Sequence, residues 1–404
     1  MHKQWTIPFL LILCVFGLSG CTGAVDINDL AMVMAVGLDK GDTPGTVTVT
    51  AQIARPSDVV GQTGAPAAGT GEPIWTATAT GRSIFDAIRN LGRYSSRRVY
   101  WGHNKVIVIG EDLARDEGIN DVVDFFSRNH ELRMRTWVVV TPDKASQIVA
   151  TKTGLEVVPG NSIDKLFHFS DLVAEAPKID LRTMQASYLS DGSEVVLPVV
   201  QTRLRGVSTD NPKEFGSTPQ VELSGTAYFE KDKLKGTLNP DDTEGLMWFV
   251  DPPKTRVVAI PCSSSNPNQT ATLEIRHYKF KVVPQYVQGR PAFRIQLNVE
   301  CNLVELDCPT KQSHQQVMKA LEASVEANLK KEISDAIEAS KTNKVDFLGL
   351  GSRFQDRYPE EWQRIKPHWD ELLSTAKVNI DVSAHIRSPV LLSTPTVPDS
   401  AGDR

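Results

Sequence analysis

Two hydrophobic periods alternate along the first 150 residues of the chain. The segments GTVTVTAQIARP (45–56) and IWTATATG (74–81) are apolar at every second position, which is typical of half-buried strands. The loop between them predicts antiparallel neighbours. IFDAIRNL (84–91) is apolar at helical spacing, whereas KVIVIG (105–110) and TWVVVT (136–141) are short continuous apolar runs. Short apolar strands that alternate with helices predict a sheet layered by helices.

From Glu194 onward the pattern consists mainly of strands. EVVLPVVQTRLRG (194–206) and QVELSGTAYFEKDKLKGTL (220–238) both alternate, and EKDK inside the second segment predicts a hairpin turn. The run SSSNPNQT (263–270) is polar and rich in turn-forming residues. We therefore expect a domain boundary at this run.

The last third combines long strands with a long helix. Residues 270–287 and 291–306 alternate as two strands, and a helix is predicted from about 311 to 341. Its apolar residues recur every four positions, and each step of four overshoots a full turn by about 40°. The apolar stripe therefore winds around the helix, which must lie across a twisted sheet or between two elements. A second helix at about 360–374 and a strand at 376–387 are expected after it.

These patterns predict an α+β (mixed α/β) fold in which β-sheets are flanked by helices. The changes in pattern divide the chain into five segments. They are a signal peptide (1–20), an N-terminal α/β domain (21–193), a middle strand-rich domain (194–268), a C-terminal α+β domain with the long helix (269–388) and a disordered tail (389–404).

The N-terminal segment has a basic start at Lys3 and an apolar core at 7–18. A core of this length covers about 18 Å as a helix, too little for an apolar layer about 30 Å thick. The following LSGC (18–21) resembles the bacterial lipobox, in which the cysteine thiol takes a diacylglyceryl group before cleavage. This resemblance predicts lipidation at Cys21, which becomes the first mature residue, and removal of Cys14. An ordinary signal peptide with a chance cysteine and an uncleaved membrane helix are the alternatives.

Composition narrows the class of partner. The chain carries 44 basic and 49 acidic side chains, a formal charge of −5, which disfavours a nucleic-acid binder. Apart from the N-terminal segment, no apolar run approaches membrane length, so a partner must supply any membrane-crossing part. Cys262, Cys301 and Cys308 match no zinc pattern. Cys301 and Cys308 could form a bridge, but the strand pattern between them favours free buried thiols.

The sequence contains no combination of residues that predicts catalysis. The common nucleophile, phosphate-binding and zinc motifs are missing, so we expect no enzyme, no cofactor and no metal site. Arg97, Arg98, Tyr100 and Trp101 have the arginine and aromatic content that protein interfaces favour. We interpret them as a possible partner interface; a site for phosphate headgroups and a solvated helix end are the alternatives.

Trp362 and Trp369 are seven residues apart, which places them near one face of a continuous helix. Core packing is the expected role of this pair, and contact with a partner is the alternative.

Several segments together resemble one protein family. They are INDLAMVMAVGLD, GRSIFDAIRNLGRYSSRRVYWGHNKVIVIGEDLARDEGI, SRNHELRMRTWVVVT, LSGTAYFEKDKLKGTL and DFLGLGSRFQDRYPEEWQRIKPHWDELL. With the lipobox before them, they resemble the C-subunit lipoproteins of bacterial spore germinant receptors, in the same order and over nearly the whole mature chain. Family members commonly have Trp-Asp after the lipidated cysteine, whereas Thr22 and Gly23 stand here.

The resemblance implies three mixed α/β domains in a non-enzymatic receptor subunit needed for nutrient-triggered spore germination. It implies A-type and B-type membrane subunits as partners, and no nucleic acid. It also implies a lipid anchor at Cys21 on the outer face of the spore inner membrane or cell membrane. A solute-capturing lipoprotein of a transport system and an envelope hydrolase are the alternatives; the first predicts two similar lobes around a cleft.

Overall fold

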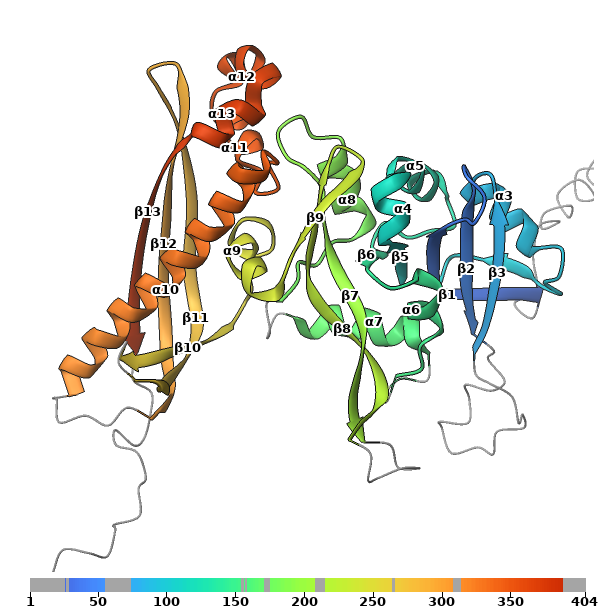
Figure 1. Ribbon diagram of the computed structural model, residues 1–404, viewed down its shortest axis with the longest axis horizontal. Helices are drawn as coiled ribbons and strands as arrows, with labels where there is room; N and C mark the ends of the chain where they lie inside the picture. Colours follow the sequence, from blue (N-terminus) through green and yellow to red (C-terminus); the bar gives the residue numbers. More distant parts are fainter. Residues whose placement is uncertain are drawn as a thin grey trace, which may run out of the picture.

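The computed structural model describes residues 26, 29–54, 74–153, 156, 158–170, 175–207, 215–263, 266–307 and 314–387 (Figure 1). The expected signal peptide, its Cys21 and the expected tail lie outside this part of the chain. Within it the backbone forms two β-sheets with helices packed against both, so the mixed α+β class is confirmed.

The first sheet has nine strands in the order β3-β2-β1-β5-β6-β7-β8-β9, with β4 paired to β1. Strands β1, β5, β6 and β7 run parallel, as does β4 beside β1, and the antiparallel strands β2-β3 and β8-β9 flank them on the two sides. The strands are β1 (Leu30–Lys40), β2 (Val47–Ala54), β3 (Ile74–Gly81), β4 (Arg98–Tyr100), β5 (Val106–Gly110), β6 (Trp137–Thr141), β7 (Val196–Val207), β8 (Phe215–Glu230) and β9 (Lys233–Leu238).

Helices cover both faces of the parallel strands. Because successive side chains of a strand point to opposite faces, Val106 and Val108 of β5 lie in one apolar cluster, and Ile107 and Ile109 in the other. Helices α6 (Ala145–Ala150) and α7 (Pro159–Phe169) contribute to the first cluster. The second cluster includes side chains of α3 (Ile84–Leu91), α4 (Glu111–Asp116), α5 (Asn120–Arg128) and α8 (Leu181–Tyr188). Burial on both faces explains why these strands are continuously apolar.

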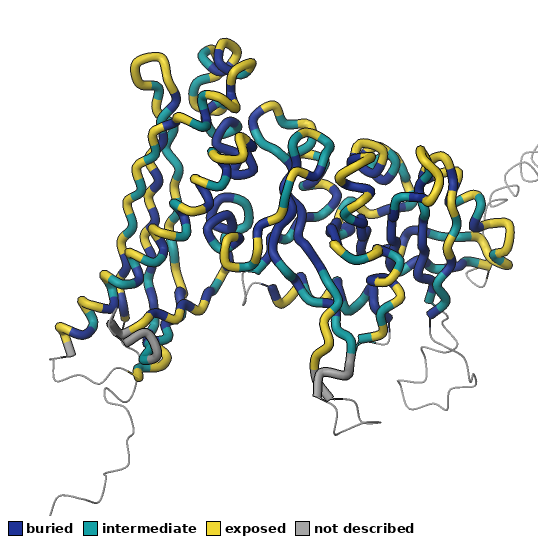
Figure 2. Tube along the Cα trace, viewed as in Figure 1, coloured by how far each residue is buried: buried dark blue, intermediate teal, exposed yellow. Residues whose placement is uncertain are grey.

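The second sheet has four strands in the order β10-β11-β12-β13, and its last pair is parallel. Helix α10 (His314–Asn343) crosses one face, beside α9 (Pro240–Val250) (Figure 1). Along β12 and β13 more buried and more exposed residues alternate, so the other face of the sheet is exposed to solvent (Figure 2). The strands are β10 (Arg256–Ser263), β11 (Asn266–Val287), β12 (Arg290–Leu306) and β13 (Lys377–Arg387).

The winding stripe of α10 is confirmed. The helix contacts α9, β10, α13 and β13, as a helix lying across a twisted sheet must. All six apolar side chains of the stripe are buried: Val317, Leu321, Val325, Leu329, Ile333 and Ile337.

The helix expected at about 360–374 is interrupted, whereas the sequence predicted one continuous helix. It consists of α12 (Pro359–Ile365), a 3-10 turn (Lys366–His368) and α13 (Trp369–Thr375). Pro367 lies in that turn, and its missing N–H and its ring interrupt an α-helix. Trp362 and Trp369 nevertheless meet, with ring centroids 5.1 Å apart, and both are buried. Core packing is therefore confirmed for this pair.

The domain boundary predicted at residue 268 does not coincide with a border between the two sheets. That residue lies inside β11, and β10 pairs with β11, so the polar run around it joins two strands of one sheet. Such a composition occurs in hairpin connections as well as in linkers. At the other predicted boundary, β7 joins β6 through the single pair Val140–Val199, so the middle strands extend the first sheet. The division into three domains stays a prediction.

A buried carboxylate fixes the helices beside the second sheet. The Asp346 side chain accepts hydrogen bonds from the backbone N–H groups of Leu350 (2.9 Å) and Gly351 (2.6 Å) and from the Trp369 indole N–H (2.9 Å). These groups belong to α11 (Leu350–Arg357) and α13. Burial raises the pKa of Asp346 above its ordinary value, and the three donors partly offset this effect.

The same segment holds the chain that leads into β7. The Asp346 carbonyl accepts a hydrogen bond from the Glu194 N–H (3.0 Å), and the Ser352 N–H donates to the Gly192 carbonyl (2.6 Å). Gly351 fits between these parts because it has no Cβ, which would lie 2.8 Å from the Gly192 oxygen. We call these contacts the Asp346 junction.

Substituting Asp346→Ala should lower the free energy of unfolding by about 3 kcal/mol or more, because three buried donors lose their acceptor at about 1–3 kcal/mol each. Asp346→Asn keeps one acceptor oxygen and should cost less. Urea unfolding measures both values. The control is Asp42→Ala, an exposed site between β1 and β2 at which a change within about 0.5 kcal/mol is expected. Equal effects at Asp346 and Asp42 would contradict the junction.

Cys301 on β12 is a free, fully buried thiol, which confirms the expectation for this cysteine. The sulfurs of Cys262 and Cys308 lie outside the described side chains. Burial raises the pKa of the Cys301 thiol to about 11, and the thiolate is the reactive form. In the native protein at a pH of about 8, Cys301 should therefore resist alkylation, and it should react after unfolding. Peptide mass spectrometry measures this; rapid native labelling or a Cys301–Cys308 bridge would contradict it.

Candidate functional site

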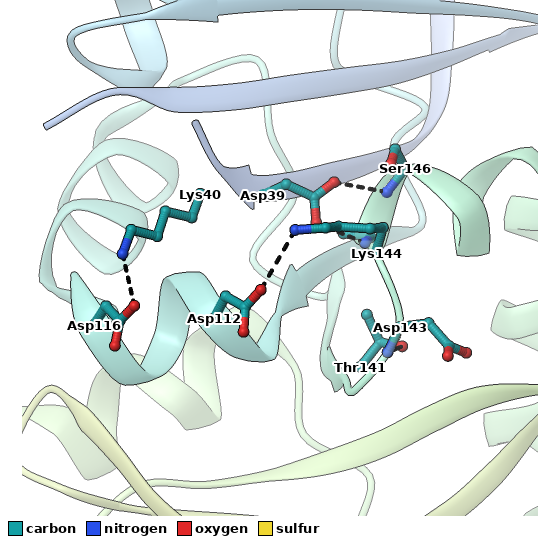
Figure 3. Close-up of polar contacts among 9 residues, drawn as sticks. Asp39, Lys40, Asp112, Asp116, Thr141, Asp143, Lys144 and Ser146 are labelled. Atoms are coloured by element: carbon teal, nitrogen blue, oxygen red, sulfur yellow. Dashed lines mark hydrogen bonds and ion pairs between the residues drawn. The ribbon is translucent and has the colours of Figure 1, made fainter. Parts of the chain in front are cut away.

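The carboxyl ends of the parallel strands are where open α/β sheets commonly bind ligands. In this chain Asp39, at the end of β1, occupies that position and is buried. Its carboxylate accepts hydrogen bonds from the N–H groups of Ala145 (2.8 Å) and Ser146 (3.0 Å) at the start of α6 (Figure 3). Gly110, at the end of β5, leaves room for this carboxylate, since a Cβ would lie 2.7 Å from it. The Asp39 carboxylate therefore already accepts the backbone N–H groups to which an anionic ligand would bind.

Two ion pairs lie at the same edge of the sheet, beside the carboxyl ends of the parallel strands. Lys40 pairs with Asp116 (2.7 Å) and Lys144 with Asp112 (3.4 Å), and both pairs are accessible to solvent (Figure 3). Exposed pairs of this kind contribute about 0–1 kcal/mol each. We interpret this edge as structural.

The arginine-rich segment lies elsewhere, beside a surface cavity of about 900 Å³ between α3, β4 and α5. Of the four residues predicted as an interface, Arg97, Arg98 and Trp101 line this cavity, and Tyr100 does not. We call it the arginine cavity. Its lining is Ser83, Ile84, Phe85, Ile88, Arg89, Gly92, Ser95, Ser96, Arg97, Arg98, Val99, Trp101, Asp121, Asp124, Phe125, Arg128, Asn129, His130 and Glu131.

Four guanidinium groups and three carboxylates line the arginine cavity. Two carboxylates are already paired: Glu131 with Arg98 (2.6 Å) and Asp124 with Arg128 (2.6 Å). Among the described residues, neither Arg89 nor Arg97 has a carboxylate within ion-pair distance, and Arg89 lies over the Phe85 ring at 4.8 Å. The cavity therefore holds positive charge that is available to an anion.

Aromatic rings form the base of the cavity. Trp101 is 4% exposed and meets Phe126 edge to face at 6.5 Å, so it supports the cavity instead of offering open surface. Phe85 and Phe125 join α3 to α5, with ring centroids 6.3 Å apart. Tyr100 instead lies edge to face with His103, with ring centroids 6.1 Å apart.

Only Arg97, Arg98 and Trp101 among the nineteen residues that line this cavity were predicted from the sequence. Ile84 and Ile88 already face the core at a spacing of four, and Phe85 and Arg89 share the same spacing on the next face of the helix. That signal could have added both residues to the site. The wall formed by α5 and Glu131 could not be found in this way, because it comes from about thirty residues further along the chain.

The described residues also bear on metal sites and membrane-spanning helices. Across the described ranges, no three His, Cys, Asp or Glu side chains are arranged to hold a metal ion. None of the helices assigned there is both long and apolar enough to cross a membrane.

Comparisons with known proteins give a consistent result. The family model described as the spore germination protein N-terminal domain matches residues 23–202, and that of the spore germination B3/GerAC-like C-terminal domain matches residues 224–389. Spore germination protein KC of Bacillus subtilis (strain 168) is 29% identical over 402 residues, 98% of each chain. Spore germination protein B3 of the same organism is 24% identical over 390 residues, 95% of this chain and 97% of its own.

A solved structure has the same fold. The crystal structure of the GerBC protein matches with a TM-score of 0.55 and 21% identity, covering 87% of this chain and 97% of that one. The two family domains follow each other in order over most of the sequence, and the relatives match from end to end. The chain therefore belongs to the spore germination protein family, as its sequence predicted.

Proposed function

We propose that this spore germination protein is the lipid-anchored, non-catalytic C subunit of a germinant receptor, needed for nutrient-triggered germination. The observation that carries the proposal is the ordered match of both family domains across residues 23–389. The lipobox immediately before this range supplies the anchor. The A-type and B-type subunits are the proposed partners, at the outer face of the spore inner membrane or cell membrane.

The architecture supports this function over solute capture by a transport lipoprotein. Solute capture predicts two similar lobes around a cleft. The two sheets of this chain differ in strand number, in strand order and in the helices that cover them. At the carboxyl ends of the parallel strands, the Asp39 carboxylate already occupies the backbone donors that a substrate would need. This likewise favours contact with other proteins over chemistry on a bound substrate.

Replacing Cys21 with Ala should release the protein from membranes and impair nutrient-triggered germination, because the acyl chains contribute about 0.8 kcal/mol per buried methylene. Labelled palmitate and membrane fractionation measure the anchor, and loss of absorbance of spore suspensions measures germination. Cys14→Ala is the matched control: it lies in the segment expected to be removed and should change neither readout. A Cys21→Ala protein that stays in the membrane without lipid would contradict the anchor.

The partner assignment has its own test. The lipoprotein, captured from detergent-solubilised spore membranes, should bring down A-type and B-type subunits. Recovery of a transporter permease in their place would favour solute capture. The Cys21→Ala variant, captured in the same way, separates the two contributions, since contacts between proteins should survive in detergent when the acyl chains are absent.

A further inference from the structure

The topology places the arginine cavity beside the start of the folded chain. The first residues of β1 pair in parallel with β4, with Leu30 opposite Arg98 and Met32 opposite Tyr100. Paired strands lie about 4.8 Å apart. Cys21 precedes Leu30 by nine residues, which span at most about 32 Å when fully extended. A lipid on Cys21 therefore keeps Arg98 and the cavity within about 40 Å of the bilayer surface.

The charge of this region has the opposite sign to that of the whole chain. Residues 82–100 contain five arginines and one aspartate, whereas the full chain carries −5. Arg93, Arg97 and Arg98 are exposed. The facing helix α5 adds Asp121, whose carboxylate accepts a hydrogen bond from Asn120. With the other two carboxylates already paired, the cavity and its rim keep a net positive charge.

Exposed aromatic side chains border the same region. Phe85 and Tyr94 are about half exposed (52% and 51%), although both are large and apolar in part. Tyr94 is held in place by its hydroxyl, which donates to the Thr78 carbonyl (2.7 Å), and by the Trp75 ring at 6.0 Å. Aromatic rings beside arginines are typical of surfaces that rest at the headgroup level of a membrane.

We propose that the arginine cavity and its rim bind the phosphate headgroups of anionic phospholipids, and so orient the subunit on the bilayer next to its anchor. Arg89 and Arg97 supply charge that no described carboxylate compensates, and exposed Ser96 supplies a hydroxyl donor. Arginine binds phosphate oxygens through two parallel N–H donors. The inference rests on the proposed anchor, because the short tether is what favours a lipid over an acidic segment of a protein partner.

The test uses the intact lipoprotein reconstituted into vesicles of phosphatidylcholine alone or with phosphatidylglycerol. Hydrogen exchange of the amides in residues 84–100 should slow by about fivefold or more on the anionic vesicles, since each arginine near such a surface contributes about that factor. About 0.5 M salt should abolish the difference. Equal exchange on the two vesicle types would overturn the inference.

Matched variants assign the effect to the cavity. In Arg89→Gln/Arg97→Gln, slowing on anionic vesicles should fall below about twofold. Arg290→Gln/Arg364→Gln removes the same charge from exposed sites on β12 and α12, at the other end of the molecule (Figure 1), and should behave as the unaltered protein. Asp121→Asn removes one negative charge from the cavity and should strengthen the slowing, a gain that a folding defect cannot produce. Equal responses of the two double variants would contradict the assignment.

Two readouts separate this inference from the proposed function. Flotation with neutral vesicles reports the lipid anchor alone, so a protein that floats but shows no response to phosphatidylglycerol refutes only the headgroup site. In spore membranes, the photo-crosslinker p-benzoylphenylalanine in place of Tyr94 should form adducts with phospholipid. Adducts with a protein subunit instead would identify an acidic protein segment as the occupant and overturn the proposal.

Discussion

The arrangement of the C-terminal half depends on one buried carboxylate, that of Asp346. Burying a charge is costly unless hydrogen bonds replace the lost water, and here two backbone N–H groups and one indole N–H replace it. The three donors come from two helices that no regular backbone ladder joins. Because the Asp346 carbonyl also binds the Glu194 N–H, the same residue holds the second sheet's helices against the strand that extends the first sheet. Arg353 strengthens this connection by donating to the Phe249 carbonyl (2.8 Å) at the end of α9.

The elements that the sequence predicts well are those in which periodicity and burial agree. The strand β5 is continuously apolar because both faces are covered, and α10 carries a winding stripe because it crosses a twisted sheet. Prediction is less specific where one local signal fits two structures. A polar, turn-rich run occurs in linkers and hairpins alike, and residue 268 of this run lies inside β11, so the domain boundary placed there stays a prediction. The separation of α12 from α13 follows from Pro367, whereas the contact of Trp362 with Trp369 survives because the turn keeps both rings in the core.

The candidate site shows the same limit at the level of side chains. Arg97 and Arg98 could be found because they lie together in the chain. The residues around them could not be found from the sequence. Arg98 and Glu131 are 33 positions apart, and the hydrophobic pattern does not indicate which residues of β1 and β4 pair with each other. Trp101 was grouped with the arginines by composition, yet it is buried beneath them. Composition alone does not distinguish a ring that forms the base of a cavity from one that borders it.

The position of β1 links the proposed anchor to the rest of the molecule. The proposed tether would lead into this strand, which pairs with β2, β4 and β5 and therefore lies inside the nine-stranded sheet. That sheet continues through β6 and β7 to the chain held by the Asp346 junction. A contact between the arginine cavity and lipid would thus add a second attachment point beside the first. Two such attachment points would restrict the tilt of this sheet as well as its distance from the membrane, and they would thereby determine which faces of the second sheet and its helices are presented to the proposed membrane-embedded partners.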